Sequence, residues 1–188
     1  MKKKNTTLSA LLTPDYMFES YAEVTPEFLA SIGIKALLID IDNTLAPYEQ
    51  TQPNAANIAW LDSLHANGIK TALISNNRRA RVELFSKELG IDAYANSKKP
   101  FSPTLIAAMK NMDVAPDITA GLGDQLITDT LAAHRLGMVS IIVPPIKDKT
   151  SPFFKAKRSI ERPYIKKYRK ANGIEVKQGS LSERTWKK

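Results

Sequence analysis

A short apolar segment followed by two carboxylates constrains this chain more than any other stretch. Residues 36–39 (ALLI) form a continuous apolar run, and Asp40 and Asp42 follow it, one residue apart. Such a run is typical of a parallel strand covered on both faces, and open α/β sheets bind ligands where such strands end. Two carboxylates this close repel each other unless a cation compensates, and Mg²⁺ commonly uses carboxylates together with substrate phosphate oxygens. The alternative is a solvated turn, because Asp and Asn are ordinary turn residues.

The composition indicates one globular domain. The 188 residues suffice for a sizeable core, and 43% of them are apolar and 24% charged. The absence of cysteine excludes disulfides, zinc–thiolate sites and cysteine nucleophiles. The basic residues 2–4 are not followed by a long apolar run, and no stretch reaches the length of a membrane-spanning helix. We therefore expect a cytoplasmic protein, and peripheral contact with the inner membrane face is compatible with this expectation.

Positive charge is concentrated at the end of the sequence. Residues 147–188 hold 14 Lys and Arg against four Asp and Glu, whereas the other 146 residues hold 13 against 15. A basic extension of this kind can bind nucleic-acid phosphates or an anionic membrane surface. A solvated helix face with a frayed end explains the same composition, so both interpretations stay open.

Strands and helices alternate along the middle of the chain. The apolar periodicity predicts strands at residues 36–39, 69–74, 93–95, 117–122 and 139–143, and helices at 53–67, 79–89, from 103 onward, and from a Thr128 cap to Gly137. This alternation predicts an α/β fold with βαβ units, a parallel sheet and right-handed crossovers.

Three regions follow from these patterns. Residues 1–34 form a lead-in that we expect to pack on the core, with a helix at 26–31 that begins with Thr25 as cap and Pro26 in its first position. Residues 35–146 form the core. Residues 147–188 form the basic extension, which we expect to be partly helical or disordered, with a helix at 153–170 broken or kinked at Pro163.

Polar residues follow four of the predicted strands at the point where each strand ends. They are Asp40 and Asp42, Ser75 and Asn76, Lys99, and Asp124 with Asp129. The ends of parallel strands share one edge of a sheet, so these side chains can converge although they are distant in sequence. Carboxylates can hold Mg²⁺, whereas a hydroxyl, backbone N–H groups and a lysine can hold phosphate oxygens. This combination predicts phosphoryl-transfer chemistry.

The order of these residues resembles that of haloacid dehalogenase (HAD) superfamily phosphatases. The motifs are D-x-D-x-T at 40–44, an apolar strand ending in Ser at 73–75, Lys before Pro at 99–100, and G-D-x₄-D at 123–129. The resemblance covers roughly residues 8 to 145. It is closest to the YqeG-like group of subfamily IIIA, which is related to the mitochondrial phosphatidylglycerophosphate phosphatase of fungi. It implies a Rossmann-like three-layer sandwich around a central parallel sheet.

The resemblance also implies roles for the carboxylates. Asp40 is then the nucleophile and a ligand of Mg²⁺, and it forms an aspartyl-phosphate. Asp42 protonates the leaving alkoxide, activates the hydrolytic water and offers its backbone carbonyl to the metal. The side chain of Asp124 completes the protein ligands. Asp129 supports the metal through water or by orienting the site lysine. Thr44 braces the loop that carries Asp40 and Asp42.

Phosphate binding is expected from the second and third motifs. The resemblance implies that Ser75 and the N–H of Asn76 bind phosphate oxygens. Lys99 neutralises the charge of the nucleophile and the phosphate, and its neighbour Lys98 is a second candidate for this role.

Other polar residues allow two interpretations. Arg78, Arg79 and Arg81 lie at a predicted helix start, where they either hold an anionic substrate or face solvent. His65 and His134 lie on predicted helices away from the strand ends, so we expect surface or packing roles.

The spacing of the motifs leaves no room for a cap domain. Residues 44–75 hold one predicted helix and one strand, and residues 77–98 hold one helix and a short strand. A capless site is open, which favours large or surface-bound phosphate esters over small sugar phosphates. The resemblance and the basic extension point to a lipid phosphate headgroup, phosphatidylglycerophosphate. The alternatives are nucleic-acid ends, phosphoproteins, or a non-catalytic module that binds RNA or a ribosomal partner.

Overall fold

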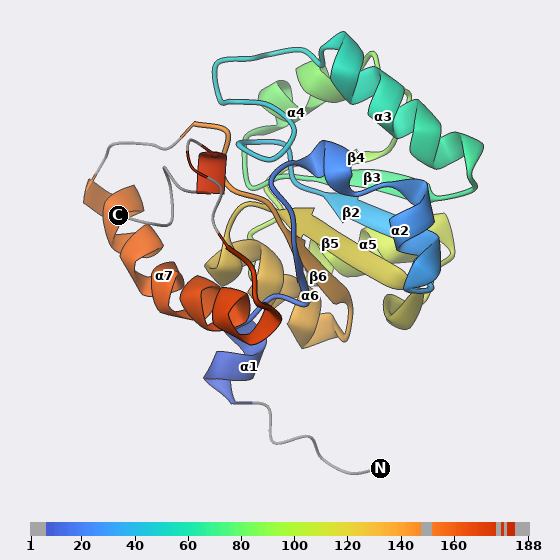
Figure 1. Cartoon of the computed structure of the whole chain (residues 1–188). Helices are drawn as coiled ribbons and strands as arrows, with labels where there is room; N and C mark the ends of the chain where they lie inside the picture. The colour runs from blue at the N-terminus through green and yellow to red at the C-terminus, as the bar shows by residue number, and fades with distance from the viewer. Residues whose placement is uncertain (1–6, 148–151, 176–177, 179, 183–188) are drawn as a thin grey trace.

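A six-stranded, entirely parallel sheet forms the centre of the protein in the computed structural model, which describes residues 7–147, 152–175, 178 and 180–182 (Figure 1). The spatial order of the strands is β1-β6-β5-β2-β3-β4. The strands are β1 Tyr16–Met17, β2 Ala36–Ile39, β3 Lys70–Ile74, β4 Ala93–Tyr94, β5 Thr119–Gly123 and β6 Val139–Ile142. Expectations for residues 1–6, 148–151, 176–177, 179 and 183–188 lie outside the described residues.

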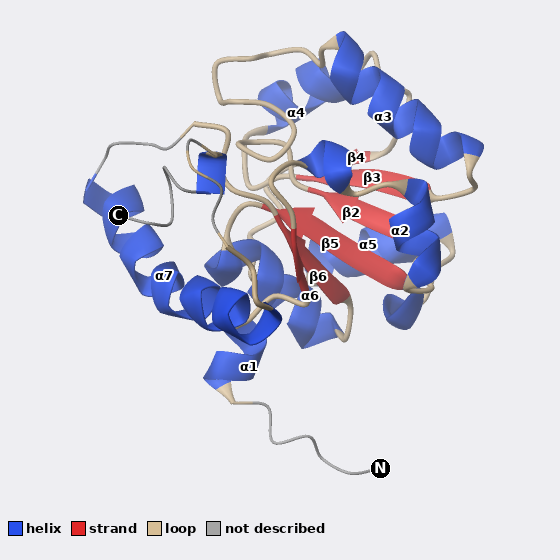
Figure 2. Cartoon of the chain, viewed as in Figure 1, coloured by secondary structure: helices blue, strands red, loops and turns tan. Residues whose placement is uncertain are grey.

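Helices cover both faces of this sheet (Figure 2). They are α1 Leu8–Leu12, α2 Pro26–Ser31, α3 Ala55–Ala66, α4 Arg79–Ser86, α5 Pro103–Met112, α6 Leu131–Leu136 and α7 Pro152–Asn172. Successive side chains of a strand point to opposite faces. Leu37 and Ile39 accordingly pack in a cluster with residues of α2, α3 and α4, whereas Leu38 packs with residues of α5 and α6. The α/β three-layer prediction is confirmed.

Local sequence signals explain several element boundaries. The Thr25 hydroxyl accepts a hydrogen bond from the Phe28 N–H at 3.2 Å, and Pro26 occupies the first turn of α2. Asn54 and Asn57 form a reciprocal capping box at the start of α3. Gly137 ends α6 at φ 78°, a left-handed conformation that glycine adopts without a Cβ penalty.

One predicted helix start was wrong. Thr128 does not cap a helix: it lies inside a π-helical turn, Leu126–Thr130, which continues into α6. The helix in the extension was expected to be broken or kinked at Pro163, and α7 runs through this residue without a break. Proline removes one helical hydrogen-bond donor, but residues on either side of it, Glu161 and Ile165, are both buried, so α7 packs on the core before and after Pro163.

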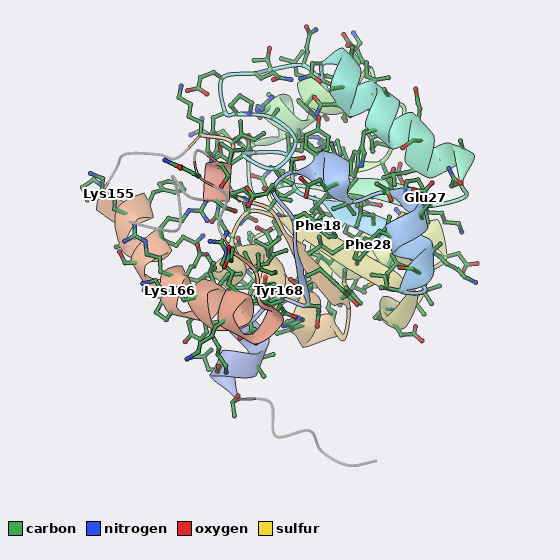
Figure 3. The ribbon with its side chains drawn as sticks, viewed as in Figure 1. Phe18, Glu27, Phe28, Lys155, Lys166 and Tyr168 are labelled. Atoms are coloured by element: carbon green, nitrogen blue, oxygen red, sulfur yellow. The ribbon has the colours of Figure 1, made fainter. Side chains whose placement is uncertain are left out.

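The lead-in contributes to the sheet itself, which the sequence did not reveal. β1 pairs in parallel with β6, with Tyr16 opposite Ile141. Its aromatic neighbours interlock with α2, because the ring of Phe28 lies edge-on to both Tyr16 and Phe18 at centroid distances of 5.0 and 4.8 Å (Figure 3). A strand of two residues gives little periodic signal, so only the tertiary pairing defines it.

No inserted domain follows the first or the second motif at the carboxyl ends of the strands. Residues 44–75, described throughout, form only α3 and β3 as regular elements, and residues 77–98 form only α4 and β4. Among the described residues, none of the helices combines the length and apolar character needed to cross a membrane.

Phe28→Ala should destabilise the protein by about 2–4 kcal/mol, because it removes a partly buried ring and two edge-to-face contacts. Urea denaturation followed by circular dichroism measures this change. The matched control is Phe101→Ala, since Phe101 is 62% exposed and its removal should cost less than about 1 kcal/mol. Equal losses for both variants would contradict a structural role for the aromatic cluster.

His134 should make stability depend on pH. Its Nε2 lies 2.9 Å from Asp15 Oδ2 and its Nδ1 lies 3.0 Å from the Leu11 carbonyl oxygen. Burial lowers the pKa of His134, but the hydrogen bond and charge of Asp15 outweigh it and raise the pKa above 6.5. The folded state therefore binds the proton more tightly, so this stabilisation is complete below pH 6.5 and is lost as the pH rises through the raised pKa.

Unfolding free energies of wild type and His134→Gln should consequently converge as the pH rises. The control is His65→Gln, because Nε2 of His65 faces the Thr71 hydroxyl at 2.7 Å and not a carboxylate. A wild-type-to-H134Q difference that stays constant between about pH 5 and 9 would refute the assignment.

Candidate active site

Three neighbouring strands bring the predicted site residues to one edge of the sheet. β2 lies between β5 and β3, and Asp40, Asp124 and Ser75 each come directly after one of these strands. The N–H of Asp40 also donates to the Leu122 carbonyl at 2.9 Å, so the pairing with β5 continues to the first carboxylate. The strand-end argument thus places residues that are up to 84 positions apart in one site.

Lys99 is the centre of this site. Its buried Nζ lies 2.7 Å from Asp40 Oδ1 and 2.6 Å from Asp129 Oδ1, and it donates to the Ile74 carbonyl at 2.9 Å. Burial alone lowers the pKa of an ammonium group, but the charges of Asp129 and Asp40 outweigh it and raise the pKa of Lys99. Lys99 is therefore held as a cation between two carboxylates. Lys98, the other candidate, is exposed.

Asn76 fixes the backbone that carries this lysine. Its Oδ1 accepts hydrogen bonds from the Lys99 N–H at 2.7 Å and the Ser97 hydroxyl at 2.8 Å, and its Nδ2 donates to the Lys99 carbonyl at 3.2 Å. The sequence predicted a phosphate contact through the Asn76 N–H. The side chain has a different function, because it connects the end of β3 to the segment that follows β4.

Asp42 faces the start of α4. Its Oδ2 accepts from Asn77 Nδ2 at 3.1 Å and from the buried Ser75 hydroxyl at 3.4 Å, and its Oδ1 lies 3.3 Å from the Arg81 guanidinium. Of the three clustered arginines, Arg81 contacts Asp42, Arg79 pairs with Glu83 on the surface, and Arg78 is exposed. These contacts orient one carboxylate separately from the others.

Three buried carboxylates could hold a metal ion. Asp40, Asp124 and Asp129 each offer an oxygen within 4.8 Å of the other two. Within the described part of the chain, Oδ1 of the buried Asp124 has no hydrogen-bond partner, and burial raises the pKa of both Asp40 and Asp124. Ionising these groups requires more positive charge nearby, and hard oxygen ligands suit Mg²⁺. The residues therefore fit the predicted cation. Asp129 belongs to this cluster of carboxylates, whereas the Asp42 carboxylate contacts Ser75, Asn77 and Arg81.

The glycine of the last motif makes room for Asp129. A Cβ on Gly123 would overlap the Asp129 side chain. Asp129 Oδ2 also accepts hydrogen bonds from the Gln125 N–H at 3.1 Å and the Thr128 hydroxyl at 3.2 Å. The π-helical turn therefore folds back so that Asp129 lies over the end of β5, beside Lys99.

Backbone hydrogen bonds hold the loop that follows β2 and carries Asp40 and Asp42. Asn43 adopts a φ of 66°, its N–H donates to the Ala46 carbonyl at 2.7 Å, and its carbonyl accepts from the Ile146 N–H at 3.1 Å. Thr44 is buried, and its Oγ1 finds no hydrogen-bond partner in the segments that the structure describes. Its predicted bracing role stays a prediction.

The sequence analysis missed two residues of α7. Arg158 NH1 donates to the Asp124 carbonyl at 2.7 Å, its NH2 pairs with Asp124 Oδ2, and Glu161 Oε2 lies 3.0 Å from NH1. Residues 158, 161, 165 and 168 recur at helical spacing and are all buried, but only Ile165 and Tyr168 are apolar, so an apolar pattern could not identify the two charged residues. The overall basicity of the extension concealed this periodicity.

Tyr48 is a third site residue that the sequence analysis passed over. Burial raises its pKa, and the charges of Asp124, Asp40 and Asp42 raise it further. Tyr48 therefore keeps its phenolic proton beside the carboxylates and can act as a hydrogen-bond donor there.

Comparisons with known proteins agree with this geometry. Residues 15–143 match the family described as haloacid dehalogenase-like hydrolase. A relative named "Probable phosphatase YqeG", from Bacillus subtilis (strain 168), is 32% identical over 155 residues, which cover 82% of this chain and 90% of that protein.

Solved structures share the fold at low sequence identity. The cobalt-bound form of the deoxy-D-mannose-octulosonate 8-phosphate phosphatase YrbI from Haemophilus influenzae matches with a TM-score of 0.51 at 16% identity, over 78% of this chain and 96% of that one. An uncharacterized protein from Listeria monocytogenes serotype 4b matches with a TM-score of 0.50 at 16% identity, over 63% and 85% of the two chains. These two likenesses support the fold.

Arg81→Gln should lower kcat for phosphate-ester hydrolysis about 10- to 100-fold, because Asp42 loses the cation that orients it. Steady-state kinetics with a chromogenic phosphate monoester measures this loss. Arg79→Gln is the matched control on the same helix, since its 82% exposed side chain pairs only with Glu83 among the described residues, and it should retain wild-type kcat. Equal kcat values in the two variants would exclude Arg81 from the site.

Proposed function

This chain belongs to the haloacid dehalogenase-like hydrolase family, and from this membership and the site geometry we propose that it is a Mg²⁺-dependent phosphatase with Asp40 as nucleophile. The observation that carries the proposal is the bridging of Asp40 and Asp129 by the buried ammonium of Lys99, at 2.7 and 2.6 Å. A cation held this way neutralises a nucleophilic carboxylate and an incoming phosphate together. A non-catalytic binding module, by contrast, predicts that Asp40→Asn leaves the properties of the protein unchanged.

The first half-reaction transfers the phosphoryl group to the protein. An Asp40 carboxylate oxygen attacks phosphorus, the bond between phosphorus and the ester oxygen breaks, and an aspartyl-phosphate forms. The leaving alkoxide takes a proton from Asp42, whose carboxyl group Ser75, Asn77 and Arg81 orient. Lys99 offsets the negative charge that gathers on the transferring group.

The second half-reaction releases phosphate. Asp42, now a carboxylate, accepts a proton from a water molecule as the water oxygen attacks phosphorus. The bond between phosphorus and Asp40 breaks, which regenerates the carboxylate and leaves inorganic phosphate. Asp42 is thereby reprotonated for the next cycle.

Asp40 and Asp124 would hold the metal with the Asp42 backbone carbonyl, and Asp129 would support it. Bound Mg²⁺ supplies positive charge that offsets the negative charge of the phosphate and its carboxylate ligands. Burial raises the pKa of Asp40 and Asp124, and a divalent cation counteracts this effect by favouring their ionised forms.

For the substrate we propose a phosphate monoester at a lipid headgroup, as in phosphatidylglycerophosphate, with phosphatidylglycerol as product. No cap domain formed by the described residues covers the strand ends that carry the site, so a substrate embedded in a membrane surface can reach them. Phe101, two residues after Lys99, is 62% exposed, and Ile160 on the basic helix α7 is 57% exposed. Apolar side chains near lysine-rich segments are typical of proteins that bind an anionic membrane surface.

The proposal is tested by Mg²⁺-dependent phosphate release from wild type and Asp40→Asn. We expect release from phosphatidylglycerophosphate in mixed micelles and a loss of at least about 10³-fold in Asp40→Asn, because the amide is a far weaker nucleophile than the carboxylate. An undiminished rate in the variant would refute the mechanism. Asp15→Asn is the control, since this carboxylate lies at β1 and contacts His134.

The substrate class is decided by the same assay. A 3′-phosphorylated oligonucleotide, a phosphopeptide and sugar phosphates are compared with the lipid at equal concentration. Faster turnover of sugar phosphates would contradict the argument from the open site. Preference for the oligonucleotide would reassign the basic extension to nucleic acid.

A further inference from the structure

The C-terminal helix α7, which the family match does not include, reaches the candidate active site. The match ends at residue 143, whereas Arg158 on α7 contacts the carboxylate of Asp124. α7 runs along one end of the sheet, beside α1 and near the loops at the site edge (Figure 1). Arg158 lies outside the part of the chain that matches the family, so its contact with a site carboxylate requires a separate chemical explanation.

The contact between Arg158 and Asp124 involves two atoms of each residue. Arg158 NH1 donates to the backbone carbonyl of Asp124 at 2.7 Å, and NH2 pairs with its carboxylate Oδ2. The side chain of Asp124 is fully buried, and that of Arg158 is 7% exposed. Guanidinium is planar and presents its donors in a fixed fork, so this contact determines the orientation of the carboxylate as well as its charge.

Glu161 holds Arg158 in turn. Its Oε2 lies 3.0 Å from Arg158 NH1, and its Oε1 accepts from the Ile127 N–H at 3.2 Å. Its side chain is fully buried. Ile127 lies in the π-helical turn, between Asp124 and Asp129 in the sequence. The two α7 residues therefore contact the start and the middle of the segment that carries these carboxylates.

The rest of α7 is anchored independently of this contact. Ile165 packs in a cluster with Leu12, Leu126 and Ile142, and the Tyr168 hydroxyl donates to the Asp15 carbonyl at 3.2 Å (Figure 3). Packing on the lead-in and β6 therefore keeps the helix in place. Arg158 and Glu161 need another reason to be buried, since buried charges are costly unless they are paired.

We propose that Arg158 is a positioning residue for Asp124 and that α7 is thereby required for tight binding of the catalytic cation. Arg158 occupies Asp124 Oδ2, whereas Oδ1 is buried and has no hydrogen-bond partner among the residues that the structure describes. Holding one oxygen fixes the direction of the other, which is how outer residues orient metal ligands. This inference rests on the proposed function, because it assigns Asp124 to the metal.

A competing explanation gives the opposite result. If Arg158 acted only as a positive charge, it would repel the metal ion, and its removal would tighten metal binding. If it fixes the ligand, its removal weakens metal binding although the site becomes more negative. The sign of the change in affinity therefore distinguishes the two explanations.

The experiment measures Mn²⁺ binding to the full-length chain by electron paramagnetic resonance, with Mg²⁺ as competitor and without substrate. Arg158→Gln should weaken binding of both ions about 10- to 100-fold. Arg158→Lys keeps the charge but lacks the planar fork, so it should stay at least several-fold weaker than wild type. Lys155→Gln is the matched control, because it removes the same charge from an exposed position on α7 and should bind like wild type (Figure 3).

Circular dichroism and thermal unfolding establish that each variant is folded, and Arg158→Lys serves if Arg158→Gln is not. Wild-type or tighter affinity in Arg158→Gln, or wild-type affinity in Arg158→Lys, would overturn the inference. Such a result, with an active wild type and an inactive Asp40→Asn, leaves the proposed function intact. A wild-type chain that binds neither ion would refute both proposals.

Discussion

The structure of the site depends on one buried interaction, that of the Lys99 ammonium with the carboxylates of Asp40 and Asp129. A buried carboxylate is costly unless it is paired, and here one cation serves two carboxylates that come from different strand ends. The surrounding structure keeps this cation in place: Asn76 binds the Lys99 backbone on both its N–H and its carbonyl, and Gly123 leaves space for Asp129. The pairing therefore joins the ends of β2, β3 and β5 into a single site.

The positive charges of the site are distributed by function. Lys99 lies between Asp40 and Asp129, Arg81 lies beside Asp42, and Arg158 lies on Asp124. The carboxylates are thereby separated into one group that can bind a metal and one, Asp42, that is oriented by other hydrogen bonds, as the proposed proton transfer requires. Adjacent acids of the same type can thus have different tasks, because each has its own partners.

Much of the fold could be predicted from the sequence, because the signals were local. The strand at 36–39 and the helix at 26–31 have the predicted bounds, since a buried apolar run and a Thr-Pro start specify them directly. The π-helical turn at Leu126–Thr130 could not be predicted, because its conformation depends on the position of Asp129 over Gly123. β1 was also missed, since two residues carry no measurable periodicity and only their pairing with β6 makes them a strand.

The sequence by itself determined which strands are followed by carboxylates, a hydroxyl or a lysine. It also determined that these residues would meet at the carboxyl ends of the strands. These properties follow from residue type and from the common direction of parallel strands. The tertiary structure alone decided which groups contact each other. It turned Asp42 toward Arg81, gave the Asn76 side chain to the Lys99 backbone, and brought Arg158 of α7 onto Asp124. Such contacts depend on the relative placement of separate elements, which no local pattern encodes.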